Sequence, residues 1–291
     1  MTLSRTWRHL PVLAAFLALA AAPAAGQAEE QDYLRLGYAG FLGPVQVVAA
    51  SVGLDLAPGM AAQGPYSMAL DVTMTGPLEK LVPFHMTANS RGRTVGGGVL
   101  PAAYDSMTRI YDDGRAVRLT YADDGAVAID ADPPTVEARQ AREKGLGQGT
   151  LDPLSAVVAL VNQVIRNGAC AGRVAVFDGT RRFDLEASPA GTSEVTKIGA
   201  SLYQGPATEC AIEPVFIGGF RQADVDAGIY PRQATMWIAP VVAGAPPVPV
   251  RVTGASALGN LRLDLVEAWA MEGATAATDD PGCATAEAAT C

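Results

Sequence analysis

Few side chains in this sequence have the types and spacing that catalysis needs. It contains 2 histidines, and His85, in LVPFHMTANSRG, is the one expected to remain once the N-terminal leader described below is removed. A lone histidine on a strand, without a nucleophile or second base nearby, is more often a packing residue than a general base. The sequence also lacks the G-x-S-x-G, S-x-x-K and H-E-x-x-H patterns of serine hydrolases and zinc proteases. We therefore keep His85 as a weak functional candidate.

Charged side chains gather around a turn in VFDGTRRFDLEAS, which contains Asp178, Arg181, Arg182, Asp184 and Glu186. Two carboxylates that face each other across a cleft could hydrolyse a glycosidic bond. The same spacing is typical of a solvent-exposed hairpin face, where each cross-strand pair contributes about 0.2–1 kcal/mol. We favour the exposed face and keep Asp178, Arg181 and Arg182 as weak functional candidates.

The sequence gives no strong indication of a cofactor or a metal. Gly145, Gly147 and Gly149, in KGLGQGTLDP, precede a helix as phosphate-binding glycines do, but the Lys-Ser/Thr pair of a phosphate loop is missing. We interpret this segment as a flexible connection. No C-x-x-C motif occurs, and a single remaining histidine is a poor basis for a zinc site. We expect no cofactor and no metal.

The 4 cysteines are Cys170, Cys210, Cys283 and Cys291. An even number of cysteines in an exported chain favours disulfides, and three pairings are possible. We favour Cys170 with Cys210, because both flank strand-like segments, and Cys283 with Cys291 in the C-terminal tail. The loop-entropy model gives the first bond a stabilisation of about 4 kcal/mol.

The N-terminus has the pattern of a secretory signal peptide. Arg5 and Arg8 precede an apolar run at 10–22, and small residues follow. The run is short for a membrane span, although a retained anchor is the open alternative. We predict a signal peptide over 1–28, no transmembrane segment after its removal, and a periplasmic location.

Charge limits the choice of partners. The net charge of −9 would become −11, because residues 1–28 contain Arg5, Arg8 and no acid. Such a chain is a poor match for nucleic acid or for an anionic membrane surface. Residues 272–291 form an acidic, Ala/Thr-rich tail that is too poor in large apolar residues to build a core, and we expect it to be disordered.

The body of the chain alternates as β-strands do. In YSMALDVTMTG, Tyr66, Met68, Leu70, Val72 and Met74 fall on one face. Asp-Gly pairs at 113–114, 124–125 and 178–179 stand between such runs, and Asp-Gly is a strong hairpin signal because both residues tolerate positive φ. We expect consecutive antiparallel hairpins over a single β-rich domain at 29–271.

One helix interrupts this pattern in DPLSAVVALVNQVIRNGAC. Asp152 is a good N-cap, Pro153 suits the first helical position, and Asn167-Gly168 is a good stop. Apolar residues from Leu154 through Leu160 to Ile165 cover nearly the whole circumference, so the helix must be buried on more than one side. We therefore predict a mainly β fold in which a curved antiparallel sheet, a half-barrel or open barrel, wraps one apolar helix.

Five segments in the same order carry a family resemblance. DPLSA (152–156), VFDGTRRFDLEAS (176–188), YQGPATEC (203–210), MWIAP (236–240) and PVPVRV (247–252) resemble the domain-of-unknown-function family 3108 of bacterial exported proteins. The resemblance covers about residues 31–271. It implies a secreted, mostly β domain and no established activity.

Two functional hypotheses follow. The first is a non-enzymatic binding or cell-envelope maintenance protein that holds a lipid, another apolar ligand or a segment of an envelope protein. The second is an envelope-directed hydrolase that uses carboxylates. For the first, we slightly favour a trough completely filled by the helix and by Met68, Leu70, Met74, Phe183 and Trp237 over an open pocket.

Overall fold

Thirteen strands form one antiparallel sheet in the computed structural model, which describes residues 33–55 and 63–271. The strands are β1 (Tyr33–Leu42), β2 (Val45–Asp55), β3 (Gly64–Met74), β4 (Phe84–Val95), β5 (Gly98–Ile110), β6 (Asp113–Tyr121), β7 (Val127–Asp132), β8 (Gly172–Phe177), β9 (Arg182–Val195), β10 (Gly205–Gly218), β11 (Ala234–Ala239), β12 (Val248–Ser256) and β13 (Gly259–Met271). Their order is β7-β6-β5-β4-β3-β2-β1-β13-β12-β11-β10-β9-β8. Two meanders therefore meet where β1 pairs with β13.

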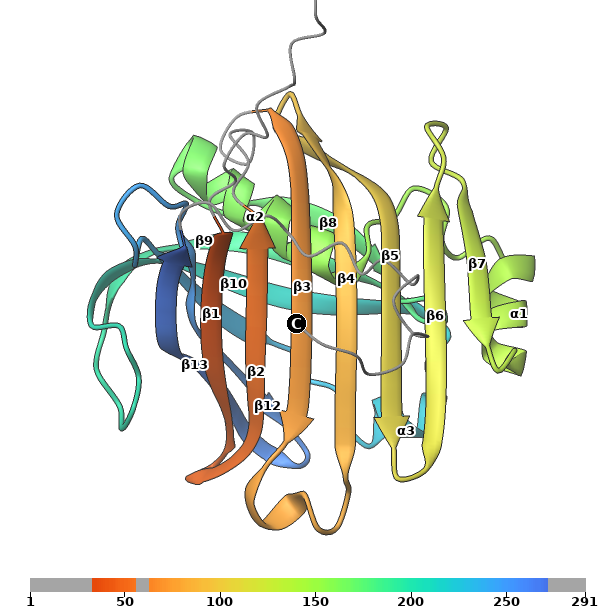
Figure 1. The fold of residues 1–291 in the computed structure, drawn as a ribbon, viewed down its shortest axis with the longest axis horizontal. Helices are drawn as coiled ribbons and strands as arrows, with labels where there is room; N and C mark the ends of the chain where they lie inside the picture. Colours follow the sequence, from red (N-terminus) through yellow and green to blue (C-terminus); the bar gives the residue numbers. More distant parts are fainter. Residues whose placement is uncertain (1–32, 56–62, 272–291) are drawn as a thin grey trace, which may run out of the picture.

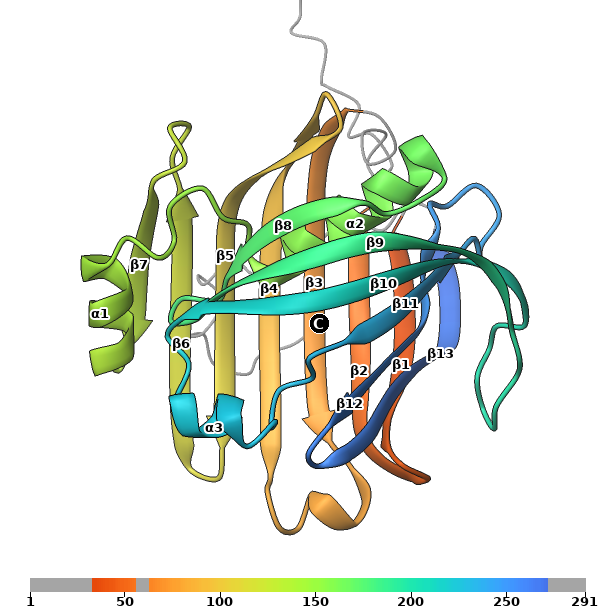
Figure 2. The same cartoon turned by 180° about the vertical axis from the view of Figure 1, so that it is seen from behind.

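The helices are few and short apart from one. They are η1 (Gly76–Leu78), α1 (Val136–Glu143), α2 (Pro153–Asn167) and α3 (Gln222–Asp226). Seen from both sides, α2 lies between strands β3 to β5 on one side and β8 to β10 on the other (Figures 1 and 2). The sheet folds over the helix without closing, which confirms the predicted mainly β fold and curved antiparallel sheet.

The ends of α2 follow from its sequence. The Oδ1 atom of Asp152 accepts hydrogen bonds of 3.0 Å from the backbone N–H groups of both Leu154 and Ser155, which would otherwise be unsatisfied in the first turn. Gly168 ends the helix in the left-handed region at φ 68°, which glycine adopts without strain. The predicted helix limits are therefore correct.

The two free ends of the sheet, β7 and β8, are bridged by the segment between α1 and α2. The backbone N–H of Gly149 donates to the carbonyl of Gly125 at 3.1 Å, and that of Leu151 donates to Ala175 at 2.8 Å. Gly145 and Gly149 both adopt left-handed φ values. The glycines thus belong to a connection between two sheet edges, as expected, but backbone hydrogen bonds hold this connection in place, so it is not the flexible one that the sequence suggested.

Both faces of α2 pack against the sheet. Leu154 and Val158 belong to an apolar cluster to which all thirteen strands contribute, while Leu160 and Val164 belong to a second cluster with β8 to β11. Burial on the two faces explains why the helix lacks a polar stripe. The burial is incomplete, however, because Pro153, Val157 and Ile165 are only half-buried.

Candidate functional site

An apolar cavity of about 200 Å³ lies between α2 and the concave face of the sheet. Four of its residues come from one side of the helix, and the rest come from β1 to β3, from β11 to β13 and from the residue before β12. They are Leu154, Val157, Val158 and Val161 of α2, and Leu36, Tyr38, Ala50, Val52, Leu54, Met68, Leu70, Met236, Pro247, Val248, Pro249, Val252 and Leu263. The helix is thus the roof of the cavity and the sheet is its floor.

The chemistry of this wall is almost uniform. Tyr38 is the one residue among those that line the cavity with a polar side chain, and its hydroxyl donates to the backbone carbonyl of Pro249 at 2.9 Å. Burial raises the pKa of Tyr38, so the hydroxyl stays neutral. An apolar cavity of roughly 150 Å³ stays dry and can hold a small hydrocarbon such as benzene. This cavity therefore suits a hydrocarbon and offers nothing to a charged group.

The cavity communicates with solvent. Ala50, Leu70, Val157, Val252 and Leu263 all line it, yet each is only half-buried. Side chains in a filled core would be almost fully buried, because interiors pack as densely as organic crystals. The trough is therefore an open pocket where these five residues line it.

The expectation of a completely filled trough is thus wrong. Met68 is buried, but Leu70, Met74 and Phe183 are half-buried. Trp237 does not line the cavity; its Nε1 donates to the Ser193 hydroxyl at 2.9 Å. Its neighbour Met236 lines the cavity instead, because successive residues on a strand point to opposite faces.

Beside the cavity, the start of α2 carries a buried polar network. The Oδ2 atom of Asp152 accepts hydrogen bonds from the hydroxyls of Ser155 and Ser90, and the hydroxyls of Ser155 and Tyr66 are 2.6 Å apart. Loss of hydration on burial raises the pKa of Asp152 and raises that of Tyr66 to about 12. All four side chains are buried, so the network positions the helix and does not face a substrate. The N-cap could be predicted from sequence, but its partners could not be, because Ser90 is 62 residues from Asp152 and Tyr66 is 89 residues from Ser155.

The hairpin candidates are occupied by structural contacts. The Oδ1 atom of Asp178 accepts from the backbone N–H groups of Thr180 and Arg181 at 3.0 and 2.8 Å, and Oδ2 accepts from the Arg181 Nε at 2.8 Å. The Arg182 guanidinium donates to the carbonyls of Leu146 and Gln148. These three candidates therefore shape the β8–β9 turn and its contact with the connection before α2.

The expectation that this hairpin face is solvated fails at Asp184. Its side chain is 0% exposed and is paired with Arg173 of β8, while the Nε of Arg182 lies 4.0 Å from its Oδ1. A buried carboxylate is tolerated here because arginine side chains flank it. Glu186, two residues along the strand, is exposed as expected.

His85 lies apart from these groups. Its Nε2 is 3.0 Å from the Oδ2 of Asp71, and both side chains are about half exposed. Met86, the next residue, packs against the inner apolar cluster, so His85 points to the outer face of the sheet. The structure therefore does not bring His85 together with Asp178, Arg181 or Arg182.

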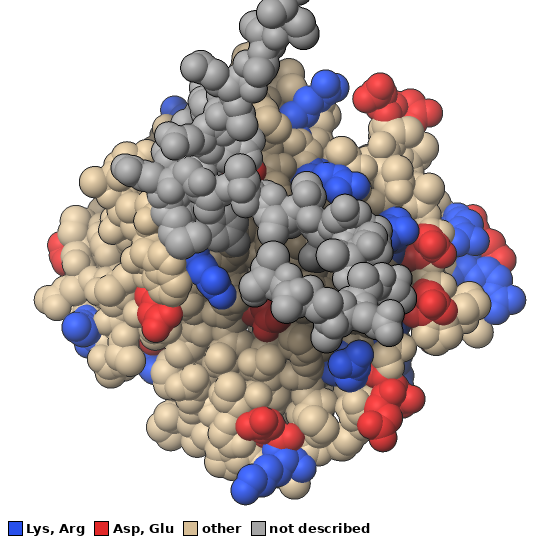
Figure 3. Space-filling view, viewed as in Figure 1, with Lys and Arg blue, Asp and Glu red and all other residues tan. Residues whose placement is uncertain are grey.

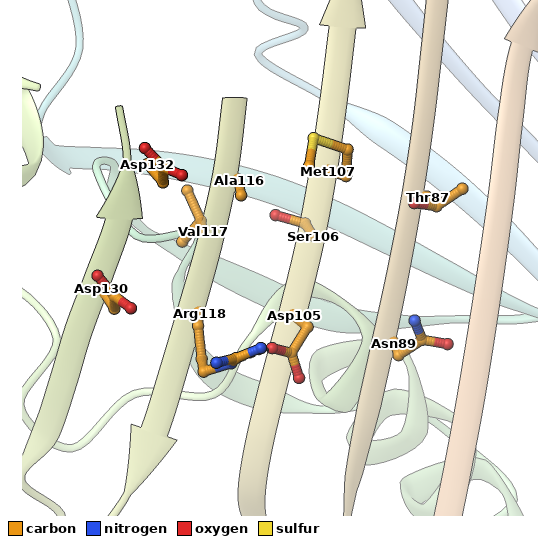
Figure 4. Close-up of a pocket in the computed structure, with 10 residues that line it drawn as sticks. All are labelled: Thr87, Asn89, Asp105, Ser106, Met107, Ala116, Val117, Arg118, Asp130 and Asp132. Carbon is orange, nitrogen blue, oxygen red and sulfur yellow. Dashed lines mark hydrogen bonds and ion pairs between the residues drawn. The ribbon is translucent and has the colours of Figure 1, made fainter. Parts of the chain in front are cut away.

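A polar hollow on the outer face of β4 to β7 is shown in Figure 4. Arg118 of β6 and Asp105 of β5 point toward each other and form an ion pair, with Asp130 on the next strand. The Arg118 side chain is 66% exposed, so this pair is screened by solvent. We regard the hollow as a surface feature.

No other kind of site is indicated by the surface charges, the potential metal ligands or the helices of the described residues. Acidic and basic side chains are interspersed on the face in Figure 3, so the described part of that face has no extended patch of one sign. Among residues 33–55 and 63–271, no group of three or more His, Cys, Asp or Glu side chains is placed to hold a metal ion. No helix in these ranges combines the length and the apolarity needed to cross a membrane.

Cys170 and Cys210 form the predicted disulfide, with their Cα atoms 5.8 Å apart. Both are fully buried, and the bond joins the segment after α2 to β10. Cys210 pairs across the sheet with Met236, which lines the cavity. The disulfide therefore holds the far end of the helix against the cavity wall. Cys283 and Cys291, as well as the predicted signal peptide and tail, lie outside the described residues.

The chain is similar to a known family and to a solved structure. The family described as "Protein of unknown function (DUF3108)" matches residues 60–266. No curated protein matches the sequence. Among solved structures, the crystal structure of a beta-barrel-like protein of domain of unknown function DUF1849 from Brucella abortus is similar, with 8% sequence identity and a TM-score of 0.43. That match covers 83% of this chain and 98% of the other.

Proposed function

We propose, from the premise that this chain belongs to the DUF3108 family of proteins of unknown function, that it acts by binding an apolar ligand and not by catalysis. The ligand would occupy the trough between α2 and the sheet. One observation carries the proposal: the open cavity has an apolar wall whose single polar side chain is already hydrogen-bonded. Pockets of this kind are usual sites for small apolar molecules.

Export to the periplasm is part of this proposal. The N-terminal pattern of Arg5, Arg8 and a short apolar run supports a cleaved leader. The buried Cys170–Cys210 disulfide is typical of proteins that fold in an oxidising compartment. In that compartment, an apolar-ligand protein would have lipids and envelope proteins as its neighbours.

A carboxylate hydrolase is the weaker candidate. It requires two acids that face each other and are free to exchange protons with a substrate. Asp178 is bound by its own turn and Asp184 is buried against Arg173. A protein segment in the trough is a further alternative. Its backbone N–H and C=O groups would lose their hydration against an apolar wall whose single polar side chain, Tyr38, is already hydrogen-bonded.

An equilibrium titration with the apolar fluorophore N-phenyl-1-naphthylamine tests the binding proposal. We expect saturable binding by the parent and its loss in Ala50→Phe, which places a ring inside the cavity. Ala49→Phe is the matched control, since Ala49 lies next to Ala50 but borders a hollow on the outer face. Equal binding by all three proteins would show that the probe binds elsewhere and would reject the trough as the site.

A further inference from the structure

We infer that the trough takes a single extended alkyl chain, with the polar head of the ligand left outside the cavity. This inference rests on the proposed function and specifies its ligand class. It follows from the shape of the apolar surface beyond the cavity and from the kinds of side chain that form it.

The apolar surface continues from the cavity along the inner faces of neighbouring strands. Val72 pairs with Ala50 of β2 and with Met86 of β4, and Met74 pairs with Val48. Directly paired residues lie on the same face of a sheet, so this group shares the concave side with Met68 and Leu70.

These residues also keep partial contact with solvent. Val48, Val72, Met74 and Met86 are each half-buried, in contrast to the buried Met68 at the helix end. From Met68 to Met74 the strand advances six residues, or roughly 20 Å at about 3.3 Å per residue. The apolar surface is therefore long as well as open, which matches a chain better than a compact ring.

The wall chemistry favours the same ligand. Leucine, valine, alanine, proline and methionine provide all the lining of the cavity apart from Tyr38, whose hydroxyl is already engaged. Flexible methionines at 68, 74, 86 and 236 adapt to an unbranched chain more readily than rigid aromatic walls do. A carboxylate or other polar head would lose its hydration inside without gaining a partner, so it would stay in solvent.

Chain length then sets affinity. Each methylene that enters the trough should tighten binding about fourfold, until the apolar surface is covered. The test is displacement of bound N-phenyl-1-naphthylamine by octanoate, decanoate, dodecanoate, tetradecanoate and hexadecanoate. We expect affinity to rise along the series and then level off.

A variant at the open end separates this inference from the proposed function. Val72→Asn should leave the affinity for octanoate within twofold of the parent and weaken hexadecanoate at least tenfold, because only the longer chain reaches it. Thr73→Asn is the control, since this neighbour pairs with His85 on the outer face and should change neither value.

The outcomes distinguish the two claims. Two results would overturn the alkyl-chain inference and leave the apolar site intact. In the first, all the fatty acids displace the probe equally well. In the second, Val72→Asn changes the affinities for octanoate and hexadecanoate by the same factor. Failure of the probe and of directly titrated hexadecanoate to bind at all overturns both.

Discussion

The hydroxyl of Ser90 on β4 donates a hydrogen bond of 3.0 Å to the carboxylate of Asp152, and the same carboxylate caps α2. The start of the helix is thus tied to one half of the sheet. Its end is tied to the other half by the disulfide between Cys170 and Cys210 of β10. The roof of the cavity is therefore fixed at both ends, which keeps the space beneath it from collapsing.

The Asp152 carboxylate should make stability depend on pH. Burial raises its pKa in the folded protein above the ordinary value near 3.9, so between these two values the folded state binds more protons than the unfolded state. The contribution of Asp152 to the free energy of unfolding therefore falls as pH rises through this window and is constant above it. Asp152→Asn, which keeps the cap but cannot ionise, should gain stability relative to the parent over the same window, as measured by urea unfolding.

Asp152→Ala provides the comparison. It should lose about 2 kcal/mol from the missing cap, because the N–H groups of Leu154 and Ser155 lose their acceptor. A stability difference between Asp152→Asn and the parent that does not change with pH would mean that the carboxylate keeps its ordinary pKa.

Removal of the disulfide should loosen the roof. The bond closes a loop with a sequence separation of 40, for which the loop-entropy model gives about 4 kcal/mol. We expect the double variant Cys170→Ala/Cys210→Ala to lose a similar free energy of unfolding in urea. Non-reducing peptide mapping of the parent should find the linked pair, whereas free thiols at both positions would refute the pairing. Cys283→Ser/Cys291→Ser serves as the control and should leave that linked peptide in place.

Burial of α2 can be tested at Leu160, which is 1% exposed. Leu160→Asp forces a carboxylate without a partner into an apolar cluster and should cost roughly 4 kcal/mol or prevent folding. The same change at Leu258, which is 61% exposed between β12 and β13, should stay within about 0.5 kcal/mol. Equal urea midpoints for the two variants would place the helix at the surface.

Catalysis should be absent. A screen on ester, peptide, glycan and phosphate substrates is expected to remain at background, because Asp178 and Asp184 are held in structural contacts and His85 stands apart on the outer face. Turnover that disappears in Asp178→Asn, Asp184→Asn or His85→Gln would instead identify an active site. The fold of each variant is checked by its circular dichroism spectrum, so that lost turnover is not mistaken for unfolding.

Most of the fold could be predicted from local sequence patterns. The alternating runs and the Asp-Gly pairs at 124–125 and 178–179 predicted hairpins correctly, whereas Asp113-Gly114 begins β6 and the turn before it consists of Tyr111 and Asp112. The caps at Asp152 and Gly168 predicted the limits of α2. Because apolar residues cover nearly the whole circumference of α2, the helix had to be buried on more than one side, and this requirement predicted a curved sheet. These signals lie within a few residues of one another, so a single sequence is sufficient to recognise them.

Long-range relationships could not be predicted in this way. Whether a concave surface is filled or open depends on how strands far apart in sequence, such as β2 and β12, are placed around the cavity that both of them line. It also depends on a β-bulge between Trp237 and Ile238. Asp184 has the alternation of an exposed residue, but Arg173 of the neighbouring strand pairs with it. The inner and outer faces thus followed from the pattern, while the degree of burial did not.

Native mass spectrometry of the protein purified from its own cell envelope tests the central claim most directly. The account predicts a population of heavier molecules carrying an apolar ligand that organic solvent extracts, and predicts that Ala50→Phe purified in parallel carries none. A parent that has only the mass of the polypeptide, or an equal ligand load in Ala50→Phe, would contradict the assignment of the trough as the binding site.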